Sequence, residues 1–366
     1  MIEISILILT KNGGPIFRSC LEAVCAQTQT GKTEVIVVDS GSTDGTREIA
    51  KSFPVRLEEI PAESFHHART RNFAATLARG KILIFLSQDA IPASEVWLST
   101  MVSNFDDPRV GAAYGRQLPK LGSSLERQDA LDAIYGEVRV VKDPAHRNGL
   151  GYRFYHFSDV NAAIRRSVWE GARFPEDLRV FEDLGIAKRI LDSGWKIVYE
   201  PKSAVYHSHS HTTVGLFKRY FDIGYTLKLL QIWDAPGTRK SMLAEFWKLL
   251  RNKVRRMGRR GNGQLASEGI RQDIAKSVGL FLGLNQSYLP LVLKRRLSAF
   301  RVFESKEENR GLGQSPQEQT DLSTSQSRGT LTLEPPPVGS DSRNGPTVGA
   351  RITESCDSHH RNTISY

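Results

Sequence analysis

Residues 81–92 constrain the fold more than any other stretch of this chain. The six residues from Ile82 to Ser87 carry no charge, and most of them are branched or aromatic, which predicts a strand buried on both faces. Asp89 follows at the carboxyl end of this strand, and we expect Pro92 to stop further pairing. A strand buried in this way is typical of a parallel sheet that helices cover on both sides.

Two similar apolar runs earlier in the chain extend this prediction to a whole sheet. Residues 4–10 and 34–39 read as buried strands, and the segment 16–29 between them has apolar residues at helical spacing. Strand, helix and strand in this order form a unit of a parallel sheet. A further strand at 55–60 and a helix at 67–78 lead to the stretch described above, so the predicted fold class is α/β with a mostly parallel central sheet flanked by helices.

The predicted strands end in polar residues at Thr10, Asp39 and, just beyond the third strand, Asp89. Ligands of open α/β sheets bind outside the carboxyl ends of the strands. An acid at such a position is placed to hold a divalent cation, and the cation can hold phosphates. The alternative is that Asp89 only caps the following helix, with residues 93–95 as its first turn.

The composition, and the absence of two common nucleotide-binding motifs, limit which binding partners and which cellular compartment are expected. The formal net charge of +10 indicates an anionic partner, such as a nucleotide, a nucleic acid or a membrane surface. The glycines of the first loop, Gly13 and Gly14, lack the spacing of a dinucleotide-binding loop, and no phosphate-binding loop of the Gly-Lys-Ser/Thr type is found. The cysteines Cys20, Cys25 and Cys356 lack metal spacing, which favours a reducing compartment.

The start of the chain and its hydropathy predict a cytoplasmic location. No basic leader precedes the first strand, and no apolar run approaches the roughly 20 residues of a membrane helix. A peripheral position at the inner face of the membrane is compatible with this expectation, because the C-terminal part is basic.

These polar strand ends and several later motifs together resemble the family 2 glycosyltransferases, which have the GT-A nucleotide-diphospho-sugar transferase fold. The resemblance covers residues 1–225, and local forms at 85–90 and 205–209 are most similar to the rhamnosyltransferase branch. It implies an inverting transfer of a sugar, rhamnose in that branch, from a dTDP- or UDP-linked donor to a glycan or lipid-linked acceptor in surface polysaccharide biosynthesis. The motifs that carry it are residues 6–12, 35–46, 68–72 with Gly80, 88–90, 181–183 and 207–209.

The resemblance also implies which residues bind the nucleotide sugar. Asp39 would accept a hydrogen bond from the N3–H group of uracil or thymine, and Thr10, Asn12 and Ser42 would line the same pocket. Arg71 would lie beside the diphosphate or the base. The alternatives are that Asp39 caps a helix and that Arg71 is an ordinary surface arginine.

The predicted metal site departs from the usual family motif. The family has Asp-x-Asp, whereas this chain has Gln88 before a single carboxylate, Asp89, and we assign both residues to donor binding. A lone carboxylate needs help to hold Mn²⁺ or Mg²⁺, and His207 is the predicted second ligand because imidazole suits Mn²⁺. His209 and His211 share a face with it on an extended segment and are weaker candidates. The alternative is that all three are surface histidines.

Glu182 and Asp183 begin a predicted helix, where the helix dipole stabilises negative charge. Inverting transfer needs a group that takes the proton of the acceptor hydroxyl, and the resemblance assigns this role to Asp183. Glu182 would orient Asp183 or the acceptor. The alternative is that both acids only compensate the helix dipole.

Three further segments carry weaker predictions. Residues 116–158 lack a clean period and are expected to contact the acceptor. The aromatic residues at 152–157 would stack on a sugar ring or, alternatively, pack in the core. A strand at 195–199 is expected to end in a turn at 200–202.

The predicted domains are a GT-A domain at 1–225, a basic amphipathic helical extension at 226–303 and a disordered tail at 304–366. Within the extension, segments 242–260 and 279–296 combine apolar and basic residues, which favours contact with an anionic membrane or, alternatively, a solvated basic face. Two other functions remain open, a nucleotidyltransferase on a similar sheet and a non-catalytic scaffold recruited to a membrane. We expect no nucleic-acid partner.

Overall fold

The computed structural model describes residues 2–27, 32–120, 122–123, 128, 131–132, 134–146, 151–209, 211–235, 238–240, 263–300 and 302–303. The predicted basic segment at 242–260 and the predicted disordered tail at 304–366 lie outside these residues.

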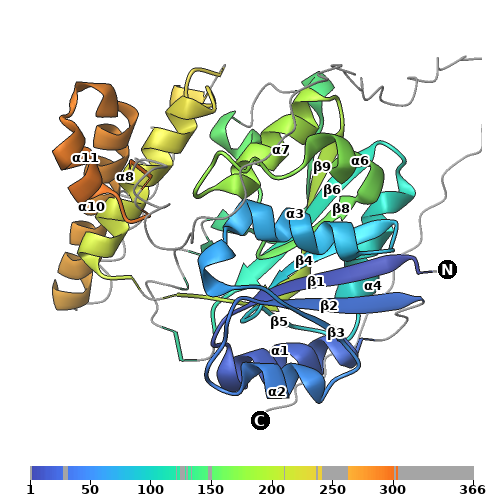
Figure 1. Ribbon diagram of the computed structural model, residues 1–366. Coiled ribbons are helices and arrows are strands. Elements are labelled where there is room, and N and C mark those ends of the chain that lie inside the picture. Colours follow the sequence, from blue (N-terminus) through green and yellow to red (C-terminus); the bar gives the residue numbers. More distant parts are fainter. Residues whose placement is uncertain are drawn as a thin grey trace, which may run out of the picture. The chain divides into compact units, whose positions relative to one another are not determined.

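A mixed sheet forms the centre of the α/β fold (Figure 1) and has nine strands within the described residues. Its order is β3-β2-β1-β4-β8-β6-β9-β5, and β7 pairs with β9. Strands β1 to β4, β6 and β9 run in one direction, and β8, β5 and β7 oppose them, which confirms the predicted α/β class with a mostly parallel sheet. The strands are β1 Ile4–Thr10, β2 Thr33–Asp39, β3 Arg56–Glu59, β4 Ile82–Ser87, β5 Ile91–Pro92, β6 Val110–Leu118, β7 Val140–Lys142, β8 Asn161–Arg165 and β9 Lys196–Tyr206.

Helices cover both faces of the sheet, as the buried strands require. One apolar core lies between the sheet and α3, α6 and α7, and a second lies between the sheet and α1, α2 and α4 (Figure 1). The helices are α1 Gly14–Cys25, α2 Thr46–Lys51, α3 His67–Leu77, α4 Trp97–Val102, α6 Arg166–Ala172, α7 Glu182–Asp192, α8 Thr213–Leu229, α10 Gly263–Leu284 and α11 Leu291–Leu297. Short 3₁₀ turns lie at Ala62–Ser64, Ser103–Asp106, Pro144–His146, Gly151–Phe154 and Gln286–Tyr288.

The strand register gathers polar residues at one edge of the sheet. Thr10 pairs with Asp39 at the carboxyl ends of β1 and β2, and Ser87 ends β4 one residue away in register. Because β8 is antiparallel to β4, its first residue, Asn161, opposes Leu86 near the end of β4. The start of β8 therefore lies at the same edge as the ends of the parallel strands.

Two predictions about this edge are wrong. Pro92 does not stop pairing, because β5 pairs with β9 through Ile91 and Pro92 at an edge of the sheet, where proline is tolerated. The segment 200–202 is no turn, because β9 runs on to Tyr206 and an irregularity in its pairing with β6 accommodates these residues. Both differences bring the ends of β4 and β9 together.

The C-terminal helices pack closely on one another. Three glycines, Gly224 on α8 and Gly279 and Gly283 on α10, let the two backbones approach, since an added Cβ would collide with a carbonyl oxygen of the other helix. The predicted domain boundary at residue 225 lies within α8, and the division into domains stays a prediction. No helix in the described part of the chain has both the length and the apolar character needed to cross a membrane.

Candidate active site

Loop residues at the carboxyl ends of β1, β2 and β4 form one hydrogen-bonded group. The Thr10 hydroxyl donates to Gln88 Oε1 at 2.6 Å, which joins the ends of β1 and β4. The backbone N–H of Asn12 donates to Ser42 Oγ at 2.8 Å, and that of Thr43 donates to Asn12 Oδ1 at 2.9 Å, which joins β1 to β2. The structure thus brings together four of the residues predicted to bind the nucleotide sugar.

Asp39 lies at the base of this group and is fully buried. Its Oδ1 accepts from the backbone N–H groups of Gly41 at 3.0 Å and Ser42 at 2.9 Å, and its Oδ2 accepts from the Ser42 hydroxyl. The alternative that it caps a helix is wrong, because Gly45 occupies the N-cap of α2 without a side-chain cap. Asp39 holds the loop in place, and its contact with a nucleotide base stays a prediction.

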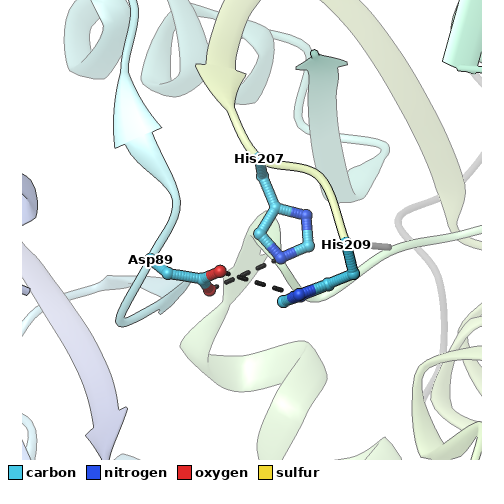
Figure 2. A group of neighbouring side chains, drawn as sticks. All are labelled: Asp89, His207 and His209. Carbon is cyan, nitrogen blue, oxygen red and sulfur yellow. Dashed lines mark ion pairs between the residues drawn. The ribbon is translucent and has the colours of Figure 1, made fainter. Parts of the chain in front are cut away.

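Asp89 faces two of the predicted histidines (Figure 2). Its Oδ1 lies 3.4 Å from His207 Nε2 and its Oδ2 lies 3.7 Å from His209 Nε2. One ligand atom from each of the three residues lies within 4.8 Å of the others, and His211 is not part of this group. Asp89 does not cap the next helix, because α4 begins only at Trp97 with Val96 at its N-cap.

A hydrogen bond from the other side of the imidazole orients His207 toward Asp89. His207 Nδ1 lies 2.9 Å from the amide oxygen of Gln117, an acceptor, so Nδ1 carries the proton and donates. Nε2 then presents its lone pair to a carboxylate, and a cation or a second proton is needed between these two acceptors. Metal-binding histidines are commonly fixed in this way, and one carboxylate with two imidazoles suits Mn²⁺ better than Mg²⁺. The donor set therefore fits a divalent transition metal.

Lys120 also contacts Asp89 and was not identified from the sequence. Its Nζ donates to Asp89 Oδ2 at 2.9 Å. Burial alone would raise the pKa of Asp89, but the hydrogen bonds and charges of His207 and Lys120 outweigh this effect and hold that pKa well below its usual range. Asp89 is therefore ionised near neutral pH in the folded protein.

A second charged group surrounds Arg71 on α3. Arg71 Nε lies 2.8 Å from Asp159 Oδ2, and its terminal nitrogen donates to Glu182 Oε1 at 2.7 Å. The alternative of a surface arginine is wrong, because only 12% of the Arg71 side chain is exposed. The guanidinium holds two acids at the edge of the sheet, and its position beside a diphosphate stays a prediction.

Asp183 belongs electrostatically to the same acidic group. Burial raises the pKa of Asp183 well above its usual value, and the charges of Asp159 and Glu182 raise it further. Burial likewise raises the pKa of Asp159, and the charge of Arg71 offsets only part of this rise. Dipole compensation alone does not account for this cluster, because acids from two separate elements converge on one guanidinium.

Gln117 links the group of Asp89, His207 and His209, a candidate metal-binding group, to the acidic group of Asp159, Glu182 and Asp183. Its amide nitrogen donates to Ser158 Oγ at 2.9 Å and to the Tyr135 hydroxyl at 2.6 Å, while its oxygen faces His207. Ser158 directly precedes Asp159, so one chain of contacts runs from Asp89 to Arg71. Gln117, Ser158 and Asp159 were missed from the sequence, although Asp159 stands immediately before an uncharged run at 160–164, the same pattern that singled out the acids after the earlier strands.

The backbone immediately before the acidic pair is strained. Phe181 has φ 59° and ψ 34°, a left-handed conformation that bulky residues rarely adopt. The Arg219 guanidinium lies 5.5 Å from the centre of its ring, and Phe300 packs against its edge at 6.3 Å. Strain of this kind persists where the surroundings hold it, and here it sets the position at which α7 presents Glu182 and Asp183.

Aromatic residues within the segment 152–157 pack in the apolar core. Phe154, Tyr155 and Phe157 are all buried, as the core-packing alternative predicted. Burial, together with the charges of Lys142 and Arg153, lowers the pKa of His156 to about 3, so this histidine is neutral. The side chain of Tyr152 lies outside the described residues.

Comparisons with known proteins agree with this geometry. Residues 5–171 match the model of the family described as "Glycosyl transferase family 2". The O-antigen chain rhamnosyltransferase RfbN of Salmonella typhimurium is 35% identical over 225 residues, which cover 61% of this chain and 71% of that protein. The O-antigen chain rhamnosyltransferase WbaN of Salmonella anatum is 37% identical over 201 residues, which cover 54% of this chain and 64% of that protein.

Two solved structures share the fold. The mannosyltransferase PcManGT from Pyrobaculum calidifontis, in complex with GDP-Man and Mn²⁺, has a TM-score of 0.51 at 19% identity and covers 76% of this chain and 87% of its own. Residues 1–349 of TarS from S. aureus give 0.51 at 18% identity, with 84% and 92% coverage. These likenesses concern the fold alone, and they confirm the predicted GT-A fold.

The raised pKa values predict how stability depends on pH. Asp183 has a folded pKa above its unfolded value of about 3.9, so at this residue the folded state binds more protons, and the contribution of Asp183 to stability declines as the pH rises above about 4. Asp183→Asn removes this penalty and keeps an oxygen for the backbone N–H of Leu184. We expect the variant to melt at a higher temperature than the natural protein near pH 8, by about 2–4 °C for each kcal/mol removed, and to show no such gain below about pH 4.

Thermal melting across this pH range measures the effect. Asp106→Asn, which neutralises an exposed aspartate, is the matched control and should leave the profile unchanged. A gain that is equal at both pH values would show that the effect of Asp183→Asn is unrelated to its ionisation.

Proposed function

This chain belongs to glycosyl transferase family 2, and on that premise we propose that it is an inverting, metal-dependent rhamnosyltransferase of surface polysaccharide biosynthesis. The donor would be a dTDP- or UDP-linked sugar, and the acceptor a glycan or a lipid-linked glycan. One observation carries the proposal: the metal-binding group around Asp89 and the acidic group around Asp183 lie at one edge of the sheet, linked through Gln117. The relatives RfbN and WbaN are named O-antigen chain rhamnosyltransferases, which supports rhamnose as the transferred sugar and surface polysaccharide biosynthesis as the pathway.

The proposed reaction is a single displacement. The oxygen of the acceptor hydroxyl attacks the anomeric carbon from the face opposite the diphosphate, and the bond from that carbon to the diphosphate oxygen breaks. The electron pair of this bond leaves with the nucleoside diphosphate, and Asp183 takes the proton of the hydroxyl. One displacement inverts the anomeric carbon, so no residue of the chain needs to act as a nucleophile.

The surroundings of Asp183 suit a general base. A carboxylate with a raised pKa binds a proton more tightly than an ordinary one, and bases work best when their pKa lies near the working pH. Its Oδ1 accepts the backbone N–H of Leu184 at 2.7 Å, which orients the carboxylate and leaves Oδ2 for the proton. Glu182 is held by Arg71 and supports this orientation.

The leaving diphosphate needs a positive charge beside it. A divalent cation, Mn²⁺ or Mg²⁺, held by Asp89, His207 and His209 would neutralise the charge that develops there. Gln117 keeps the His207 imidazole in the tautomer that binds a metal.

The loop group at the ends of β1, β2 and β4 is the proposed site of the nucleotide. Thr10, Asn12, Ser42 and Gln88 offer hydroxyl and amide groups beside the metal-binding group, since Gln88 directly precedes Asp89. A contact between Asp39 and a pyrimidine base requires its hydrogen bonds to the Gly41–Ser42 turn to rearrange, because Asp39 is fully buried.

Helices α10 and α11 supply a surface that fits an anionic membrane. Ile274, Val278 and Phe281 are exposed and lie on one face of α10, and Val292 is exposed on α11. The last turn of α11 adds three basic residues, Lys294, Arg295 and Arg296. Apolar residues beside basic ones bind the interface of a membrane that contains anionic lipids. We assign this surface to peripheral membrane contact, which suits a lipid-linked acceptor.

Loss of the base tests the proposed reaction. Asp183→Asn should lower kcat by about 10²–10⁴-fold while leaving the affinity for dTDP and UDP unchanged. In the natural protein kcat should rise with pH as Asp183 ionises, because only the carboxylate accepts a proton. Release of nucleoside diphosphate from dTDP-rhamnose and UDP-sugars measures both effects. Normal turnover of the variant would favour the non-catalytic scaffold, and release of a sugar phosphate in place of a nucleoside diphosphate would favour a nucleotidyltransferase.

Removal of a metal ligand tests the ion site. A ligand that binds the folded state raises the melting temperature, so dTDP or UDP should stabilise the natural protein more strongly when Mn²⁺ is present. Asp89→Ala should abolish this dependence on Mn²⁺, and His207→Ala should weaken Mn²⁺ binding by about tenfold or more. His146→Ala, which removes an exposed histidine outside the group, is the control. Unchanged Mn²⁺ stabilisation in Asp89→Ala would refute the assignment.

Vesicle binding tests the membrane surface. Phe281→Asp and Val292→Asp should each lower the affinity for vesicles that contain anionic phosphatidylglycerol by about tenfold or more, because each removes an exposed apolar side chain from the interface. Val96→Asp changes an exposed valine elsewhere and is the matched control. Co-sedimentation measures the binding, and equal binding of all three variants and the natural protein would contradict the proposal.

A further inference from the structure

The ion pair between Lys120 and Asp89 places an ammonium group inside the proposed metal site. Lys120 Nζ lies 2.9 Å from Asp89 Oδ2, the same oxygen that faces His209 Nε2 at 3.7 Å. The Lys120 side chain is 26% exposed and that of Asp89 is 16% exposed, so the ammonium keeps access to a ligand that arrives from solvent. An ammonium at this distance competes with a metal for the carboxylate.

The position of Lys120 is built into the fold. It follows the end of β6, where Leu118 pairs with Tyr206 and accepts the backbone N–H of His207 at 2.9 Å. Its own backbone N–H donates to the Ser208 hydroxyl at 3.2 Å, between the two histidines of the metal-binding group. Lys120 is thus attached to the segment that carries the metal-binding histidines.

Charge balance indicates what this lysine does. Asp89 carries one negative charge and Lys120 one positive charge, so this ion pair is neutral before a ligand enters. A divalent cation then matches the two negative charges of a bound diphosphate, whereas a second carboxylate in the place of Ser87 or Gln88 would leave the site negative. A cation at Asp89 repels the ammonium, and the nearest negative charge left for it is the diphosphate itself.

We propose that Lys120 is a diphosphate-binding residue that neutralises Asp89 in the absence of a metal and contacts the donor's diphosphate once a cation binds Asp89. This inference rests on the proposed function, because it takes Asp89 as a metal ligand and a nucleoside diphosphate as the leaving group. Lys120 would therefore have two opposite effects on affinity. It would weaken the binding of the metal alone and strengthen the binding of the diphosphate.

Calorimetric titration of the full chain separates these two effects. Lys120→Met keeps most of the apolar stem and removes the charge. We expect it to bind Mn²⁺ alone up to about tenfold more tightly, and to bind dTDP and UDP in the presence of Mn²⁺ at least about tenfold more weakly, as for one lost charge-assisted hydrogen bond. Lys120→Arg keeps the charge and should retain most of the nucleotide affinity. Lys202→Met, which removes an exposed lysine of β9, is the matched control.

Each outcome decides a different claim. Tighter Mn²⁺ binding with unchanged nucleotide binding in Lys120→Met would overturn the inference, since Lys120 would then only neutralise Asp89. Unchanged Mn²⁺ binding would overturn the proposed competition. If the natural protein binds nucleotide but no Mn²⁺, the metal site of the proposed function is refuted. The nucleotide affinities of the natural protein and Lys120→Met would still test whether Lys120 contacts the diphosphate.

A second variant keeps the test independent of folding defects in Lys120→Met. Asp89→Asn removes the partner of Lys120 and leaves the ammonium free for a phosphate. Without metal, it should bind dTDP and UDP at least as tightly as the natural protein does. Weaker binding of both nucleotides by Asp89→Asn under these conditions would contradict a contact between Lys120 and the diphosphate.

Discussion

The pairing of β5 with the end of β9 is the contact on which the site depends. β5 has only two residues, Ile91 and Pro92, and they pair with Tyr206 and Val205. This short ladder places Asp89, two residues before β5, beside His207, one residue after β9. Asp89 and His207 lie more than a hundred residues apart in the chain, and this pairing brings the two segments that carry them together.

The acidic group lowers the stability of the folded state, and the rest of the fold compensates for this loss. Asp159 and Glu182 share one buried guanidinium. Burial first, and then the charges of the neighbouring acids, raise the pKa values of Asp159 and Asp183. The left-handed Phe181 before them adds backbone strain. Groups that are unfavourable for stability and that converge at one edge of the sheet are typical of a site selected for chemistry. Two apolar cores, one on each face of the sheet, provide the compensating stability.

Hydrogen bonds through Gln117 join the candidate metal-binding group and the acidic group into one unit. Its amide offers an acceptor to His207 and donors to Ser158 and Tyr135, so each end of the amide is used. A buried amide that is satisfied on both sides has a single orientation, and it fixes the imidazole tautomer at the same time. The single carboxylate at Asp89, where the family motif has two, is thus accompanied by polar residues from β6 and from the segment before β8.

The sequence by itself determined the sheet, its covering helices and most of the polar residues at its edge. Apolar runs that end at Thr10, Asp39 and Ser87 predict buried parallel strands, because only strands covered on both faces are apolar throughout. Only the tertiary structure decided how these residues are used. The register of β5 on β9, the reversed direction of β8 and the approach of Lys120 to Asp89 depend on pairings between distant segments. Local residue patterns report burial and turns, and they carry no information on which distant strand will supply the partner.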